Sequence, residues 1–144
     1  QVSPNSRNTI PGKVFFTIDF RHPDDATLSK MDAEIRAAAA RLAGEIGLEL
    51  KLEEIWYSPP VKFDAHCVSA VQNGAATFGL PSMPIISGAG HDSCYIARIA
   101  PTAMIFVPCE DGISHNEVEN ATPSDIAAGC DVLLQAMVER ANAT

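Results

Sequence analysis

The sequence of 144 residues lacks long apolar runs and clusters of basic residues. No stretch approaches the roughly 18 to 20 consecutive apolar residues that a membrane-spanning helix needs, and the first residues do not resemble a signal peptide. Lys and Arg number 10 against 18 Asp and Glu, which gives a formal net charge of −8. Because phosphate binding depends on clustered Lys and Arg, this balance opposes binding to nucleic acid or an anionic membrane. We expect a cytoplasmic protein whose partner is a small molecule or another protein.

The sequence also lacks the CxxC spacing that indicates structural zinc. The four cysteines are widely separated: Cys67, Cys94, Cys109 and Cys130. We expect reduced, mostly buried thiols. Cys109 stands six positions before His115, which leaves a metal role open beside the simpler interpretation of a small buried residue.

The first part of the chain has the pattern of a strand, a helix and a second strand. Residues 13–21 alternate between apolar and polar side chains, as in a half-buried strand. Residues 25–46 repeat apolar side chains every three or four positions until Gly47, as in an amphipathic helix. Residues 48–56 alternate again before Ser58, Pro59 and Pro60 break the pattern.

Beyond Pro60 the pattern predicts alternating helices and strands. The expected elements are a helix that Asp64 caps and Gly79 ends, a strand at 84–87, a helix at 92–98, a strand at 103–107 buried on both faces, and a helix that Thr122 caps. The last helix should face inward with Ile126, Cys130, Leu133 and Met137. This order predicts part of an α/β sheet. We place a domain boundary at the proline-rich break, giving domains 1–60 and 61–144. We expect a fragment of a longer protein because Gln1 is not an initiator Met and Asn5-Ser6-Arg7-Asn8 runs straight into a strand.

Polar residues at turns and strand ends are the candidates for chemistry. In open α/β sheets ligands gather beyond the carboxyl ends of strands, where His91 and His115 are expected. A lone loop histidine is more often structural or solvated than a ligand. Arg21 can hold a carboxylate with two parallel hydrogen bonds, but a local ion pair with Asp19 or Asp24 explains it equally well. Asn8 is either a binding residue or a turn former.

Three segments together resemble a known family. They are Asn8-Thr9-Ile10-Pro11-Gly12 with Thr17 to Asp24, then Ser87-Gly88-Ala89-Gly90-His91-Asp92, then Asp111-Gly112-Ile113-Ser114-His115-Asn116. In this order they resemble the amidase branch of the M20 zinc hydrolases, which includes N-carbamoyl-L-amino acid hydrolases, β-ureidopropionase and allantoate amidohydrolase. Glu117 stands where family members often have Pro, which puts the rigidity of that loop in question.

The resemblance implies a role for each matched residue. His115 corresponds to a metal ligand, and Asn8 and Arg21 correspond to residues that bind the carboxylate end of the substrate. Gly90 through its backbone N–H and His91 through its ring line the substrate site, and His91 is also the candidate catalytic group.

The resemblance further implies an architecture and an activity. Residues 1–60 would be the second half of a lid and dimerisation domain, an α+β sandwich, and residues 61–144 the C-terminal part of a zinc-peptidase-like α/β catalytic domain. The intact enzyme would use two divalent ions (Zn²⁺, or Mn²⁺, Co²⁺ or Ni²⁺), act as a homodimer, and cleave the ureido C–N bond of N-carbamoyl amino acids. Its other metal ligands and general base would lie in the N-terminal portion, so the chain alone should be inactive and bind no stable metal pair. The alternatives are an allantoate amidohydrolase, a non-catalytic dimerisation module, and a metal-free binding protein with a degenerate site.

Overall fold

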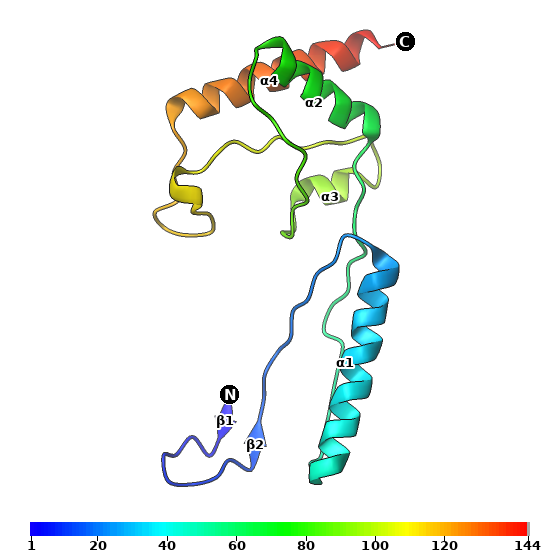
Figure 1. Cartoon of the computed structure of the whole chain (residues 1–144), viewed down its shortest axis with the longest axis vertical. Helices are drawn as coiled ribbons and strands as arrows, with labels where there is room; N and C mark the ends of the chain where they lie inside the picture. The colour runs from blue at the N-terminus through cyan, green and yellow to red at the C-terminus, as the bar shows by residue number, and fades with distance from the viewer. Residues whose placement is uncertain (144) are drawn as a thin grey trace. The chain divides into compact units, whose positions relative to one another are not determined.

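The computed structural model describes residues 1–143, and the chain divides into two compact units, Gln1–Pro60 and Val61–Thr144. The first unit contains two short strands, β1 and β2, and the long helix α1 (Figure 1). The second unit contains helices α2, α3 and α4 and the short 3-10 helix η1. No helix of the described residues is long and apolar enough to cross a membrane.

The first unit begins with a small antiparallel hairpin. β1 (Val2–Ser3) pairs with β2 (Lys13–Val14), with Val2 opposite Val14 and Ser3 opposite Lys13. The Gly12 N–H donates to the Ser3 carbonyl at 2.9 Å and closes the turn. β2 ends at Val14, and the last backbone contact of the hairpin is that of Phe15 with Gln1, where the Phe15 N–H donates to the Gln1 carbonyl at 2.8 Å. The prediction of a strand over 13–21 is therefore wrong for most of its length.

Helix α1 (Asp25–Ile46) matches the range that the periodicity predicts. The Asp24 carboxylate accepts the Thr27 N–H at 2.8 Å, which satisfies one of the free donors at the start of a helix. Gly47 ends the helix with a φ of 69°, a left-handed conformation that glycine adopts without steric cost.

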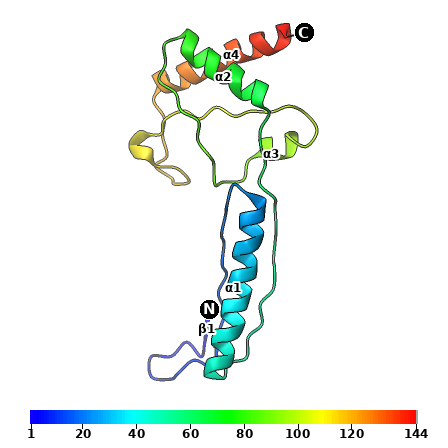
Figure 2. The same cartoon turned by 45° about the vertical axis from the view of Figure 1, so that its right-hand side comes forward.

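Residues 48–57 return along α1 without forming a strand (Figures 1 and 2). The Tyr57 hydroxyl donates to the Asp25 carboxylate at the start of the helix. Farther along, the Arg36 guanidinium lies 3.9 Å from the Glu54 carboxylate. These side-chain contacts hold the segment, whereas a strand would need a neighbouring strand to bond with its backbone. The predicted strand at 48–56 is therefore wrong for the described residues.

The second unit is organised around two capped helices. The Asp64 carboxylate accepts the Cys67 N–H at 2.9 Å and starts α2 (Ala65–Thr77). The Thr122 hydroxyl accepts the Asp125 N–H at 3.1 Å and starts α4 (Pro123–Asn142). Both caps confirm the predicted helix starts. The remaining elements are α3 (Asp92–Ile96), shorter than predicted, and η1 (Glu110–Gly112).

Helices α2 and α4 pack directly against each other (Figure 2). A Cβ added at Gly74 would lie 3.1 Å from the Val132 carbonyl oxygen, so the glycine permits a close approach of the two backbones. The Asn73 amide also donates to the Glu139 carboxylate at 3.1 Å. The buried residues of this interface are Ala70, Gly74, Ala75, Val132 and Ala136.

The predicted inward face of α4 is wrong. Ile126, Leu133 and Met137 are 50%, 50% and 61% exposed, and Cys130 is exposed as well. The sequence of α4 has apolar residues on more than one side of the helix. The side with the smaller residues packs on α2, because smaller side chains let the two helices approach more closely. The thiol prediction needs a similar correction: all four cysteines are free, but none is fully buried.

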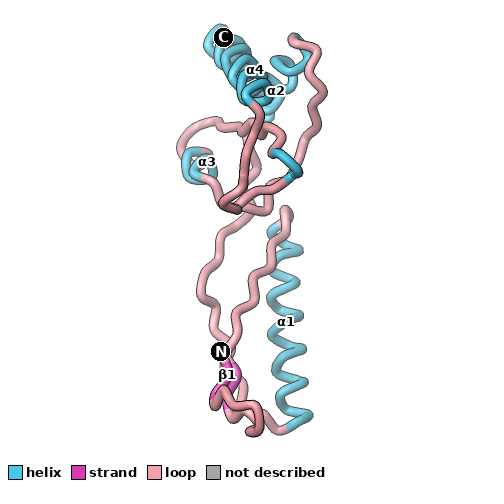
Figure 3. The backbone as a smooth tube through the Cα atoms, turned by 90° about the vertical axis from the view of Figure 1, so that its left-hand side faces the viewer, coloured by secondary structure: helices cyan, strands magenta, loops and turns pink. Residues whose placement is uncertain are grey.

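The two predicted strands of the second unit are extended loops in the structure (Figure 3). Residues 103–107 are held by other contacts: Ser93 donates to the Met104 sulfur at 2.6 Å, and Val107 packs so closely on α4 that a Cβ at Gly129 would lie 2.6 Å from it. Phe106 is 46% exposed, so burial on both faces is also wrong. Neither segment pairs with another strand among residues 1–143. The hairpin of β1 and β2 is the only sheet in this part of the chain. The prediction of an α/β fold is therefore confirmed only in part: the described residues form a mixed, helix-rich structure with one short hairpin.

Candidate functional site

The loop that carries His115 is closed at its base by two hydrogen bonds. The Glu110 N–H donates to the Asn120 carbonyl at 2.7 Å, and the Asn120 amide donates to the Glu110 carboxylate at 2.8 Å. Between them the backbone turns sharply, with φ values of 54° at Asp111 and 69° at Gly112. The acidic and glycine residues of this segment thus build a compact loop rather than a disordered one.

His115 itself has a left-handed backbone, with a φ of 55°. Its N–H donates to the Glu119 carboxylate at 2.7 Å, and the Glu119 N–H donates to the Asn116 carbonyl at 3.0 Å. The side chain is exposed, and its ring nitrogens have no hydrogen-bond partner in the part of the chain that the structure describes. A non-glycine residue in this conformation costs free energy, a feature that clusters at functional sites.

His91 is half-buried and held from two sides. Its Nε2 lies 2.7 Å from the Ser87 hydroxyl oxygen, which also accepts the Ala89 N–H at 3.2 Å. Its ring and the Phe106 ring meet in an edge-to-face arrangement, with centroids 5.6 Å apart and an interplanar angle of 66°. The His91 backbone caps α3, since its carbonyl accepts the Cys94 N–H at 3.0 Å. The imidazole is therefore oriented before any ligand binds.

Gly90 is exposed beside this histidine, and a Cβ built on it would meet nothing within 4 Å among the described residues. Its N–H has no hydrogen-bond partner there either. The donor is thus available to a ligand, and a ligand that approaches the backbone closely is one reason for glycine at such a turn.

Arg21 binds a carboxylate within its own unit. Its Nε donates to one Asp19 oxygen at 3.0 Å, and its Nη2 donates to the other at 2.7 Å. These hydrogen bonds hold the pKa of the Asp19 carboxyl below its ordinary value and raise the pKa of Arg21. Both side chains are exposed, at 59% and 68%, where such a pair is weak. The local ion pair expected as one alternative is present, and the exposed guanidinium also has the geometry to grip a ligand carboxylate.

Asn8 lies in the same unit, in the loop between β1 and β2. Its side-chain oxygen accepts the Ser6 hydroxyl at 2.7 Å, and the residue is exposed. This contact fits the turn-forming alternative and leaves the amide NH₂ group as a donor.

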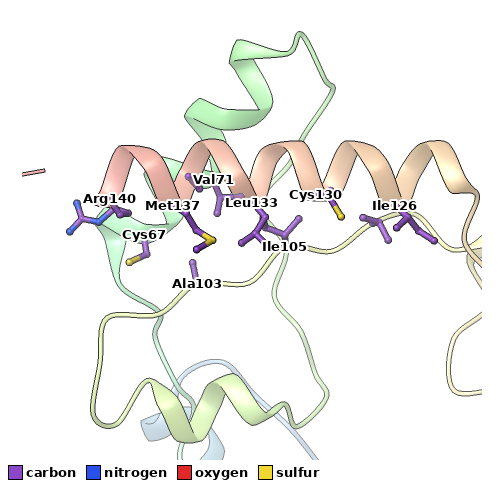
Figure 4. Close-up of a pocket in the computed structure, with 12 residues that line it drawn as sticks. Cys67, Val71, Ala103, Ile105, Ile126, Cys130, Leu133, Met137 and Arg140 are labelled. Atoms are coloured by element: carbon purple, nitrogen blue, oxygen red, sulfur yellow. The ribbon is translucent and has the colours of Figure 1, made fainter. Parts of the chain in front are cut away.

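The described part of the second unit also has an apolar groove of about 520 Å³ beside α4 (Figure 4). Its walls come from α2, α4 and residues 103–107, with Arg140 at one end. Burial is the main cause that raises the pKa of the Cys67 thiol in this wall. None of the candidate site residues lines the groove, so it is separate from the histidine loops.

The candidate residues fall into two sets. Asn8 and Arg21 belong to the first unit, and Gly90, His91 and His115 belong to the second. Among residues 1–143 no group of three or more His, Cys, Asp and Glu side chains comes together as a metal site. Cys109 and His115 thus belong to no such group among these residues.

The sequence did not predict three contacts that the two histidines make in the structure. Ser87 contacts His91, Phe106 packs on its ring, and Glu119 holds the His115 backbone. Ser87 could have been found from its spacing, since a hydroxyl four residues before a histidine across a glycine-rich turn can reach the ring. Phe106 could not, because it comes from a distant segment.

The comparison with known proteins covers almost the whole chain. The sequence profile of peptidase family M20/M25/M40 matches residues 4–139. An N-carbamoyl-L-amino-acid amidohydrolase of Rhizobium meliloti is 46% identical over 139 residues, which are 96% of this chain and 33% of that protein. An allantoate amidohydrolase of Escherichia coli is 33% identical over 90% of this chain and 32% of its own length.

A solved structure gives the same result for the fold. The crystal structure of an amidase of the hydantoinase/carbamoylase family from Burkholderia multivorans superposes with a TM-score of 0.92 at 64% identity, over 97% of this chain and 34% of that one. The chain thus spans about a third of the length of the relatives that it matches. With the profile match over residues 4–139, these similarities show that the chain belongs to peptidase family M20/M25/M40.

Proposed function

We propose that this chain is the substrate-binding and ligand-donating part of a metal-dependent amidohydrolase that cleaves the ureido C–N bond of N-carbamoyl amino acids. The observation that carries the proposal is the 46% identity over 96% of the chain to an N-carbamoyl-L-amino-acid amidohydrolase. The exposed Arg21 of the first unit and the oriented His91 and exposed His115 of the second unit support the proposal. The protein that performs the reaction would also contain the remaining two thirds that the relatives have.

His115 is the proposed metal ligand of this chain. Its exposed imidazole has no partner among the described residues, and neutral imidazole suits Zn²⁺ and related ions. We propose that the other ligands come from the rest of the full-length protein and that the chain alone would be inactive without them. When bound, a pair of divalent ions would polarise the ureido carbonyl and lower the pKa of a water molecule.

Arg21 and Asn8 are proposed to bind the carboxylate of the substrate. The guanidinium holds the Asp19 carboxylate with two hydrogen bonds, the same geometry that a substrate carboxylate requires. Because the pair is exposed and weak, a substrate carboxylate can replace Asp19. Fixing this end of the substrate restricts the position of the ureido carbonyl at the other end.

Gly90 and His91 are proposed to contact the ureido group. The free Gly90 N–H can donate to a carbonyl oxygen, and the His91 ring can donate to the oxygen that becomes negative as water adds to the carbon. Collapse of that adduct breaks one C–N bond and leaves a carbamic acid. Loss of carbon dioxide from the carbamic acid breaks the second C–N bond, so that ammonia, carbon dioxide and the free amino acid are the products.

The two units would have different parts in this enzyme. We propose that residues 1–60 belong to a lid and dimerisation domain and residues 61–144 to the catalytic domain, with a homodimer as the functional form. The division at Pro60 and the superposition on an amidase structure are compatible with this assignment.

A second candidate is an allantoate amidohydrolase, which the 33% identity to the Escherichia coli enzyme favours. The test is ammonia release by the full-length protein from a panel of N-carbamoyl-L-amino acids, N-carbamoyl-β-alanine and allantoate, with divalent metal and with chelator. We expect chelator-sensitive turnover of an N-carbamoyl-L-amino acid. Turnover of allantoate alone would select the second candidate, and silence across the panel with metal bound would reject both.

A further inference from the structure

The contact between Ser87 and His91 defines which ring nitrogen of the histidine faces a ligand. The hydroxyl oxygen lies 2.7 Å from Nε2, and Nδ1 has no hydrogen-bond partner in the described chain. A neutral imidazole carries one N–H and one acceptor nitrogen, so the role of Nε2 in this contact fixes the role of Nδ1.

The Ala89 N–H bears on the direction of the hydrogen bond between Ser87 and His91. It donates to the Ser87 oxygen at 3.2 Å and so occupies one lone pair of the hydroxyl. The hydroxyl has a single proton, which it can donate to Nε2 at 2.7 Å. When Ser87 donates to Nε2, the proton of the ring is on Nδ1.

We propose that Ser87 is a positioning residue that keeps His91 as the Nδ1–H tautomer, with this N–H directed to the ureido oxygen of the substrate. The inference rests on the proposed function for the identity of the substrate, and on the contacts above for the tautomer. The Phe106 ring, 5.6 Å from the His91 ring, restricts rotation of the imidazole away from the hydroxyl. Ser87 touches no substrate in this scheme and acts only through His91.

The kinetic test uses Ser87→Ala and Ser87→Thr in the full-length protein. Loss of one hydrogen bond that orients the donor should lower kcat about 3- to 10-fold, whereas KM should change less than about 2-fold because the carboxylate end is bound elsewhere. Ser87→Thr keeps the hydroxyl and should restore kcat. The matched control is Ser124→Ala, which removes an exposed serine hydroxyl that contacts Thr122 and not His91, and it should leave both constants unchanged.

A double variant separates positioning from general packing. In a His91→Ala background, Ser87→Ala should cause no further loss of kcat, because its effect passes through the ring. A further loss of the same size in that background would overturn the proposal, as would wild-type kinetics for Ser87→Ala alone.

The ¹⁵N resonances of the His91 ring test the tautomer without any substrate. We expect the proton on Nδ1 in the wild-type chain and a shift toward the Nε2–H form in Ser87→Ala, with His91→Ala to assign the signals. A wild-type ring protonated on Nε2 would overturn the inference even if ureido substrates are turned over. Nδ1–H with no turnover of the panel would leave the tautomer standing and reject the proposed function.

Discussion

Replacement of His115 separates the cost of its backbone conformation from its proposed role as a ligand. The residue has a φ of 55°, and its N–H is bound to the Glu119 carboxylate at 2.7 Å. Substitution by Gly, Asn or Ala keeps this backbone hydrogen bond and removes the imidazole. The three variants differ in how well they tolerate a left-handed conformation and, for glycine, in the flexibility of the unfolded chain.

The expected free energies of unfolding follow from that difference. A left-handed backbone costs an ordinary L-residue roughly 1 to 2 kcal/mol, while glycine has no such cost and asparagine a reduced one. Glycine also makes the unfolded chain more flexible, which lowers the free energy of unfolding by about 0.4 to 1 kcal/mol and offsets part of the stabilisation. We therefore expect His115→Gly and His115→Asn to be at least as stable as the wild type, and His115→Ala to be about 1 kcal/mol less stable than His115→Gly.

The functional effect should be the same for all three. Removal of a group that merely orients a metal ligand costs about 10- to 100-fold in metal affinity or activity, so loss of the ligand should cost at least about 100-fold. The assays are metal content by elemental mass spectrometry and ammonia release in the full-length protein, with denaturant unfolding in chelator for stability. The control is His66→Asn, which removes an exposed imidazole from α2 and should leave the metal content unchanged.

Two results would refute this reasoning. Full metal content and activity in His115→Asn would show that the imidazole is not a ligand. Equal stability of His115→Ala and His115→Gly would show that the backbone at this position is not left-handed in the protein.

Three further predictions concern binding, packing and pH. Arg21→Ala should raise KM about 10- to 100-fold without changing metal content, because it removes two charge-assisted hydrogen bonds, and unchanged steady-state kinetics would contradict its binding role. Gly74→Ala should lower the stability of the protein to denaturant by about 1 kcal/mol, since the added methyl would lie 3.1 Å from the Val132 carbonyl oxygen, whereas Gly44→Ala, with nothing within 4 Å, should raise it by about 0.5 kcal/mol. Asp64 has its pKa lowered below the ordinary 3.8, chiefly by a backbone N–H of α2. Its contribution to stability is thus present above that value and lost as pH falls through the lower folded pKa, so thermal unfolding of Asp64→Asn should depend less on pH in the acid range.

The sequence alone predicts the three longer helices because their signals are local. An Asp or Thr side chain caps the first turn of each helix, and a left-handed glycine follows the last turn of α1 and of α2; these signals act within four residues of the helix ends. Asp24, Asp64, Thr122 and Gly47 could therefore be assigned without any knowledge of the rest of the fold. The motif around His115 was equally visible, because its glycine, histidine and acidic residues are adjacent in the chain.

The strands and the packed faces depend on contacts between distant residues. Residues 103–107 have the composition of a buried strand, but a strand exists only where another strand bonds to its backbone, and the described residues provide none. Similarly, α4 buries Val132 and Ala136 instead of its larger apolar side chains because Gly74 lets α2 approach that stripe closely. The tertiary structure alone also decided the setting of His91, since Phe106 reaches its ring from a separate segment and Ser87 meets it only when the glycine-rich turn closes.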